Sequence, residues 1–304
     1  MNPYANRSFI ITNPAAGQQK AEKLRRRLGA AFAARNAPFD MFATDYAGHA
    51  EPLAREAARL GYRNVCIVGG DGSLAEAANG LAGMDTPLAL IPAGTANQVA
   101  QNLGIPIRLE SAVDVALNGR VAPIDLGRIG DRAFALVAGA GYDAAIMNAA
   151  TRELKERWGF GAYIYAGVSE ALKATPRRFH IVADDLDFEI DAVTVMIANV
   201  GALYGKWLPF SMPLAPEPRS AWQDGLFEVV VLSPKGFPHF ANIVWRAATK
   251  SFATNKSFLH FKTRTITIEA DPPIEVQIDG DPAGMTPITA VADPGALRMM
   301  IPSG

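Results

Sequence analysis

Residues 65–76 read VCIVGGDGSLAE: four apolar residues, a turn rich in glycine, and the beginning of a helical pattern. The apolar run is typical of a buried strand, and Leu74, Ala78 and Leu81 recur at helical spacing after the turn. A strand followed by a tight turn and a helix is the repeating unit of a parallel sheet. This stretch is therefore predicted to belong to an α/β domain.

The same order repeats through the first 124 residues. Apolar runs lead into turns of small residues and then into helical stretches, which predicts a doubly wound domain with a mainly parallel sheet. Gly61 is the expected C-cap of the second helix. Further strands are predicted at residues 9–11, 39–43 and 88–91, and helices at 20–35 and 51–61.

Beyond residue 124 the character changes to short β-rich runs, which predict an antiparallel, sandwich-like domain. We expect two domains, residues 1–124 and 125–304, with a last strand that is able to return to the first domain. The predicted strands cover residues 133–138, 179–183, 193–199, 227–232, 265–270 and 274–278. Helical stretches are predicted at residues 144–157, 163–174 and 240–252.

The composition excludes several classes of protein. Of the 304 residues, 49% are hydrophobic and 19% charged, which is typical of a globular chain and not of a disordered one. Lys and Arg total 29 against 30 Asp and Glu, so the broad basic field of a nucleic-acid-binding protein is missing. Cys66 is the single cysteine, which excludes an intrachain disulfide. We see no signal peptide and no transmembrane run, and expect a cytoplasmic protein.

The turn at residues 69–73 suits a phosphate group. Glycines allow the backbone to approach an anion, and the N–H groups at a helix N-terminus favour negative charge. Asp71 within this turn would repel phosphate unless a Mg²⁺ ion or a hydroxyl donor lies between them. The alternative is a tight strand-to-helix turn in which Asp71 is only a cap.

Two more small-residue turns follow strands, NPAAG at 13–17 and PAGTAN at 92–97. Loops after parallel strands meet at one edge of a sheet, so three such turns indicate a nucleotide site. A Walker-type P-loop is excluded because its GxxxxGK[ST] pattern is missing. We interpret GAGYDA at 139–144 as a structural turn, because the acidic residue of a dinucleotide-binding unit does not follow.

These turns, with LGIP at 103–106, resemble the lipid kinase family of bacterial diacylglycerol kinases, YegS-type lipid kinases, and sphingosine and ceramide kinases. GGDG also occurs in NAD kinases and phosphofructokinases, and PxGTxN selects the lipid branch. The resemblance continues through IDLG at 124–127, DGL at 224–226 and QIDGDP at 277–282. It implies an NAD-kinase-like α/β domain that binds the nucleotide, a β-rich domain for the lipid, and an active site in the cleft between them.

By this resemblance the protein is an ATP-dependent kinase that meets a lipid at the membrane surface. The acceptor would be diacylglycerol-like, phosphatidylglycerol-like or sphingoid, and Asp279 would accept the proton of its hydroxyl. Asp-Gly at 279–280 is also the favoured two-residue turn of a β-hairpin. A kinase of a soluble acceptor and a nucleotide-binding regulatory protein without turnover are the alternatives. Whether the chain forms a homodimer stays open.

The resemblance also implies ligand-binding residues. Asn79 is a neighbour of the nucleotide, and Thr44 is alternatively only a helix N-cap. Asp71 and Asp125 are expected to hold the catalytic Mg²⁺ through water. A second, structural site for Mg²⁺ or Ca²⁺ would use Asp224 and the carbonyls of Ala221 and Leu226. The nucleotide-binding residues are Asn13, Thr44, Gly70, Asp71, Gly72, Ser73, Leu74, Ala75, Glu76 and Thr95.

Two positions depart from the family pattern. Gln98 stands where many diacylglycerol kinases carry an aspartate, which argues more against diacylglycerol as the substrate than against kinase activity. Ser73 replaces the commoner threonine and keeps the hydroxyl. The apolar stretch at 207–214 is a candidate for insertion at a membrane surface, or alternatively a cover over the core.

Overall fold

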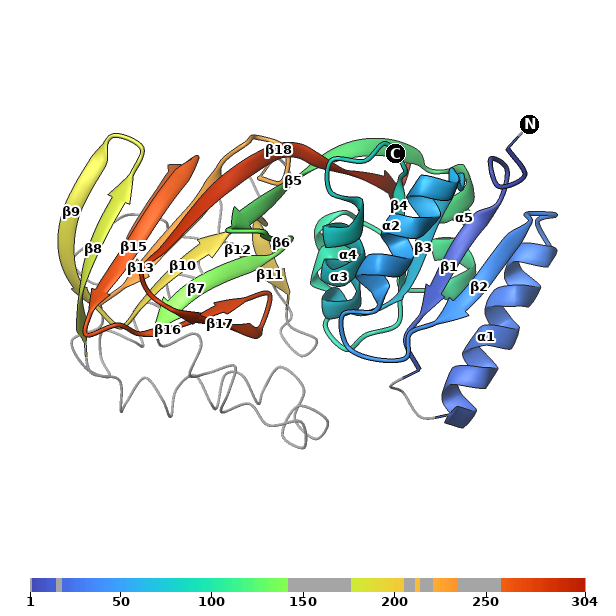
Figure 1. Ribbon diagram of the computed structural model, residues 1–304, viewed down its shortest axis with the longest axis horizontal. Helices are drawn as coiled ribbons and strands as arrows, with labels where there is room; N and C mark the ends of the chain where they lie inside the picture. The colour runs from blue at the N-terminus through green and yellow to red at the C-terminus, as the bar shows by residue number, and fades with distance from the viewer. Residues whose placement is uncertain are drawn as a thin grey trace. The chain divides into compact units, whose positions relative to one another are not determined.

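A computed structural model describes residues 2–14, 18–141, 176–204, 211–213, 221–233 and 258–303 (Figure 1). The chain divides into two compact units, unit 1 with Met1–Ile124 and Pro294–Gly304, and unit 2 with Asp125–Asp293. Strands β5 (Arg120–Ile129) and β18 (Ile288–Ile301) run from one unit into the other. The helices predicted at 144–157, 163–174 and 240–252 lie outside the described residues.

Unit 1 contains a parallel sheet with the strand order β2-β1-β3-β4-β18. The chain leaves β1 toward β2 and then crosses to the other side of β1, which makes the sheet doubly wound. In such a sheet, ligands bind outside the carboxyl ends of the strands where the order reverses, which here is at β1 and β3. The strands are β1 (Ser8–Thr12), β2 (Phe39–Ala43), β3 (Asn64–Gly69) and β4 (Leu88–Pro92).

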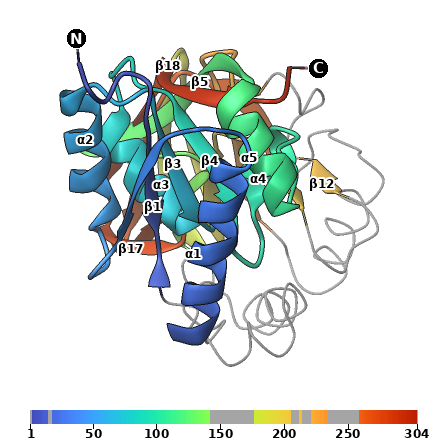
Figure 2. The same ribbon diagram turned by 90° about the vertical axis from the view of Figure 1, so that its right-hand side faces the viewer.

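Helices cover both faces of this sheet, as Figure 2 shows for α2 and α5 on opposite sides of the strands. Helices α1 (Gln18–Ala33) and α5 (Leu109–Asn118) share one core with the sheet, and α2 (Ala50–Leu60) and α3 (Asp71–Leu81) pack on each other. Gly61 ends α2 with φ 76°, as predicted. A short helix, α4 (Gln98–Asn102), follows β4.

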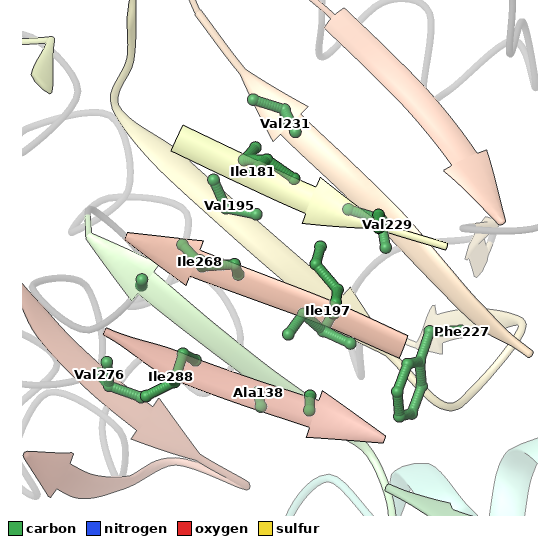
Figure 3. Close-up of a cluster of buried hydrophobic side chains, with 14 of the residues drawn as sticks. Ala138, Ile181, Val195, Ile197, Phe227, Val229, Val231, Ile268, Val276 and Ile288 are labelled. Atoms are coloured by element: carbon green, nitrogen blue, oxygen red, sulfur yellow. The ribbon is translucent and has the colours of Figure 1, made fainter. Parts of the chain in front are cut away.

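Unit 2 is a sandwich of two antiparallel sheets. Ile181 and Ile268 from one sheet and Val195, Ile197 and Val229 from the other lie in a common buried core (Figure 3). The first sheet has the order β14-β13-β10-β7-β16-β17, and the second continues from β18 through β15 and β8 to β9. The strands are β7 (Val137–Gly141), β8 (Arg177–Ala183), β9 (Leu186–Ala192), β10 (Thr194–Ala198), β13 (Phe227–Leu232), β14 (Phe258–Thr263), β15 (Thr265–Asp271), β16 (Glu275–Ile278) and β17 (Asp281–Met285). Short pairs are β5 with β6 (Arg132–Phe134), and β11 (Ala202–Tyr204) with β12 (Ser211–Pro213).

The turn predicted at residues 139–144 is wrong for residues 139–141, because these end strand β7 between β10 and β16. Residues 142–144 lie outside the described residues. Gly141 has φ 101°, and a Cβ atom there would lie 2.6 Å from the carbonyl oxygen of Val193. Gly141 is therefore required for the close approach of β7 to the neighbouring backbone in the sheet, and not for a loop. The strand predicted at 133–138 is divided between β6 and β7.

Candidate functional site

The turns after β1, β3 and β4 are joined at the carboxyl edge of the sheet in unit 1. Asn13, which follows β1, donates a hydrogen bond from Nδ2 to Ser73 Oγ at 3.2 Å. The N–H of Ala93, which follows β4, donates to the carbonyl of Gly69 at 2.8 Å. The turns that the sequence predicts to converge are thus in direct contact.

Two glycines make this contact possible. A Cβ atom on Gly94 would lie 2.4 Å from the Cα atom of Gly70, and one on Gly70 would lie 3.1 Å from the Cα atom of Gly94. Asn97 braces the second turn from a left-handed conformation with φ 48°. Its Oδ1 accepts from the N–H of Gly94, and its Nδ2 donates to the Gly94 carbonyl, both at 3.0 Å. In the sequence, Asn97 was recognised only as part of the PAGTAN motif, and its hydrogen bonds to Gly94 were not predicted.

Asp71 is a cap, but of α4 and not of its own helix, whose N-cap is Gly70. The carboxylate oxygens of Asp71 accept the N–H groups of Gln98 at 3.0 Å and Val99 at 3.1 Å. Burial raises the pKa of Asp71 above its usual value, against the effect of these N–H groups. A partly buried carboxylate of this kind favours a nearby cation.

The residues at 70–76 divide into a first turn of α3 and a following part whose polar groups already have partners within the protein. The N–H groups of the first turn of a helix have no partner within the helix, and residues 71–73 form that turn. Leu74 is instead fully buried, and its N–H donates to the Gly70 carbonyl at 3.1 Å. Glu76 accepts the N–H of Ala50 at 3.1 Å and so supports the start of α2. Backbone N–H groups without a partner in the helix are therefore confined to the beginning of the run.

Thr44 follows β2 and Thr95 follows β4, two strands that are separated by β1 and β3. Thr44 is buried, and its N–H donates to the Thr12 carbonyl at 2.9 Å. Because α2 begins after His49, Thr44 is not its N-cap. Thr95 is exposed in the turn that follows β4. Asn79 is turned to its own helix, where Nδ2 donates to the Ala75 carbonyl at 2.9 Å.

A pocket of about 600 Å³ opens next to Asn13. This volume is in the range of small-molecule sites and is large enough for a nucleoside. Its lining includes Thr12, Asn13, Leu24, Arg25, Met41 and Ala43, from α1, β1 and β2 and the turn after β1.

In unit 2, Asp279 and Gly280 form the two-residue turn between β16 and β17, with φ 49° and 92°. The hairpin that Asp-Gly predicts is therefore confirmed. The Asp279 carboxylate accepts three backbone N–H groups, from Ala135 at 2.9 Å, Leu136 at 2.9 Å and Val137 at 3.0 Å. These bonds fix the carboxylate in one orientation.

Asp125 is buried beside the loop at 221–226. Its Oδ2 accepts the N–H of Gly225 at 2.7 Å, and its own N–H donates to the Trp222 carbonyl at 3.0 Å. Asn199 Nδ2 donates to the Asp125 carbonyl at 2.7 Å. This loop contains Ala221, Asp224 and Leu226, the three residues predicted to hold a structural metal.

Asp224 is paired with a lysine that the sequence did not single out. Its Oδ2 lies 2.8 Å from Lys262 Nζ, and its Oδ1 accepts the N–H of Leu226 at 3.0 Å. Lys262 Nζ also lies 3.0 Å from Oε1 of the buried Glu228. The other carboxylate oxygen of Glu228 lies 2.7 Å from His260 Nε2. Glu228 lies in β13, and Lys262 and His260 lie in β14, so these contacts depend on a pairing of strands that the spacing in the sequence does not show.

The described residues contain neither a cluster of metal ligands nor a membrane-spanning helix. No set of three His, Cys, Asp or Glu side chains gathers there as a metal site. None of the described helices is long and apolar enough to span a bilayer. Of the apolar stretch at 207–214, the structure describes only residues 211–213, which form β12.

Comparison with known families confirms the resemblance. Residues 7–129 match the diacylglycerol kinase catalytic domain, and residues 136–301 match the YegS C-terminal NAD kinase beta sandwich-like domain. The chain belongs to this family of diacylglycerol and lipid kinases. The first matched region contains all the nucleotide-binding residues that we predict for this chain, and the second contains Asp279.

Relatives in the lipid kinase family match along most of the chain. A diacylglycerol kinase of Bacillus subtilis is 27% identical over 284 residues, 92% of this chain and 91% of that protein. A "probable lipid kinase YegS-like" of Pseudomonas putida is 29% identical over 267 residues, 87% of this chain and 86% of that protein. A crystal structure of a "putative diacylglycerol kinase" from Bacillus anthracis aligns with a TM-score of 0.80 and 25% identity over 99% of this chain and 97% of that one. The expected α/β domain followed by a sandwich-like domain is thus confirmed.

Proposed function

We propose that the protein transfers the γ-phosphate of ATP to the hydroxyl group of a lipid. The observation that carries this proposal is the contact of Gly70 with Gly94, which holds two glycine-containing turns together at the ligand edge of the sheet. This edge lies within the part of the chain that matches the diacylglycerol kinase catalytic domain.

The nucleotide would lie along the carboxyl edge of unit 1. The first-turn N–H groups of α3 would bind its phosphates, because they combine unpaired donors with the positive end of the helix dipole. Asn13 and Thr95 would donate from either side, and the buried Thr44 would bound the site at the end of β2. The pocket beside Asn13 is the part of this edge with room for the nucleoside.

Magnesium would be held through water by Asp71 and Asp125. Both carboxylates already accept backbone N–H groups, so water-mediated contact suits them better than a full set of direct bonds. The ion would neutralise the phosphate charge that Asp71 would otherwise repel.

Asp279 would accept the proton of the lipid hydroxyl as the oxygen attacks phosphorus. Three backbone N–H groups orient its carboxylate, and a base must be held in position before it takes a proton. The relatives' names support a lipid acceptor, and the diacylglycerol-like, phosphatidylglycerol-like and sphingoid classes all carry a suitable hydroxyl.

The test is transfer of labelled phosphate from ATP, with Mg²⁺, to diacylglycerol, monoacylglycerol, phosphatidylglycerol, sphingosine and ceramide in mixed micelles. The wild type should label one of these lipids, and Asp279→Asn should lose at least about 100-fold in rate, as expected for a general base. Asparagine tolerates the left-handed backbone at this turn, so the variant should fold.

Asp281→Asn is the matched control. Asp281 lies two residues away in the same hairpin, is exposed, and pairs with Arg132 at 3.1 Å. Its replacement should leave the rate within about threefold of the wild type, because exposed ion pairs contribute little. Labelling of no lipid while ATP still binds would favour a soluble acceptor or a regulatory role instead.

A further inference from the structure

Lys262 provides a positive charge at the loop where the family pattern leads us to expect a metal ion. Its Nζ lies 2.8 Å from Asp224 Oδ2 and 3.0 Å from Glu228 Oε1. The Glu228 side chain is 1% exposed, so its charge requires a partner within the protein. One ammonium group thus serves both carboxylates.

A divalent ion does not fit this arrangement. Mg²⁺ or Ca²⁺ would bind an Asp224 oxygen at about 2.0 to 2.6 Å. One of these oxygens already faces the Lys262 ammonium group, and the other accepts the N–H of Leu226. An ion at Oδ2 would meet the positive charge of Lys262 at close range, and the two cations would repel each other.

We propose that the Lys262 ammonium group takes the place of a structural metal ion beside Asp224, so that this loop is held without any divalent cation. A lysine ammonium group carries its charge at neutral pH, so it can offset the charge of the buried Glu228 as well as that of Asp224.

The loop held in this way is the one that contacts Asp125. Gly225 donates its N–H to the Asp125 carboxylate, and the Trp222 carbonyl accepts the N–H of Asp125. Lys262 is thus a positioning residue, which steadies the loop and through it a buried carboxylate. This inference rests on contacts within unit 2 and does not require the proposed kinase activity.

The test is thermal melting of the full chain without nucleotide, in EDTA and in millimolar CaCl₂ or MgCl₂. Wild type and Lys262→Arg, which keeps the charge, should melt at the same temperature in all three solutions. Lys262→Met should melt about 3 to 6 °C lower in EDTA, because Glu228 and Asp224 lose their common partner. The partial exposure of Lys262 keeps this loss below that of a fully buried ion pair. CaCl₂ should recover part of this loss, since the two carboxylates then bind the ion.

Lys23→Met is the control, because Lys23 is an exposed residue of α1, and it should melt as the wild type does in every solution. The proposal is overturned if CaCl₂ or MgCl₂ raises the melting temperature of the wild type and Asp224→Asn abolishes the rise. It is also overturned if Lys262→Met is as stable as the wild type in EDTA. Should Lys262→Met fail to fold, the comparison of wild type, Lys262→Arg and Asp224→Asn still decides the question.

Discussion

Replacing Gly94 by alanine tests the contact on which the nucleotide site depends. The new Cβ atom would lie 2.4 Å from the Cα atom of Gly70 and 3.0 Å from Asn97 Oδ1. Carbon atoms normally approach to about 3.5 to 4.0 Å, so one of the two turns has to move by about 1 Å. Overpacking of this size costs about 1 to 3 kcal/mol, and we expect Gly94→Ala to lower the melting temperature by about 3 to 9 °C.

Tryptophan fluorescence reports on unit 2, because all four tryptophans lie in its part of the sequence. Circular dichroism at 222 nm reports on the helices of the whole chain, those of unit 1 included. Gly94→Ala should lower the transition followed by circular dichroism more than the transition followed by tryptophan fluorescence. It should also weaken the binding of an ATP analogue, because the turn after β4 moves.

Gly72→Ala is the matched control, since a Cβ atom at Gly72 meets nothing within 4 Å. In the first turn of α3, alanine should raise stability by about 0.4 to 1 kcal/mol. This variant should still lose nucleotide affinity, because the new methyl group occupies the space that the phosphates would approach. The reasoning fails if Gly94→Ala melts within 1 °C of the wild type, or if Gly72→Ala is the less stable of the two.

Three further predictions concern unit 1. Asp71→Ala should lower its stability by about 1 to 2 kcal/mol in urea unfolding, because α4 loses its cap, and no change would contradict this role. Burial and a hydrogen bond to Asp40 raise the pKa of Tyr62 to about 12, so this residue's contribution to stability is complete below pH 10 and is lost as pH rises through 12. The stability difference between wild type and Tyr62→Phe should therefore narrow over that interval, and a constant difference would show that Tyr62 does not titrate in this way. Burial raises the pKa of the Cys66 thiol to about 12, so Cys66 should react with a thiol reagent at pH 8 only after unfolding.

Much of unit 1 could be predicted because its signals are local. Each buried strand is a short apolar run that ends in a small-residue turn, and Gly61 marks the end of α2 by its own backbone freedom. The doubly wound arrangement then follows from the general behaviour of parallel sheets, whereas the order of the strands is known only from the structure. In unit 2 the runs for β13 and β15 were found within one residue, because their apolar side chains face the sandwich core.

The polar contacts could not be predicted, because they depend on which strands become neighbours. Asp71 reaches the residues at 98–99, and Asp279 reaches those at 135–137, across long stretches of sequence. The same is true of Lys262, which meets Asp224 only through the pairing of β13 with β14. The incorrect prediction of a turn at 139–141 has a related cause. In the sequence, glycines required for close packing in a sheet cannot be distinguished from glycines required for a turn.

The most direct test of the central claim is to measure phosphate transfer to lipid and nucleotide binding on the same preparations of wild type, Asp279→Asn and Asp281→Asn. Calorimetric titration with an ATP analogue gives the affinity, and labelled ATP with mixed micelles gives the rate. Our account predicts equal nucleotide affinity in all three proteins, and a lipid product that Asp279→Asn alone fails to form. A lipid product formed by Asp279→Asn at the wild-type rate would contradict the assignment of Asp279 as the base.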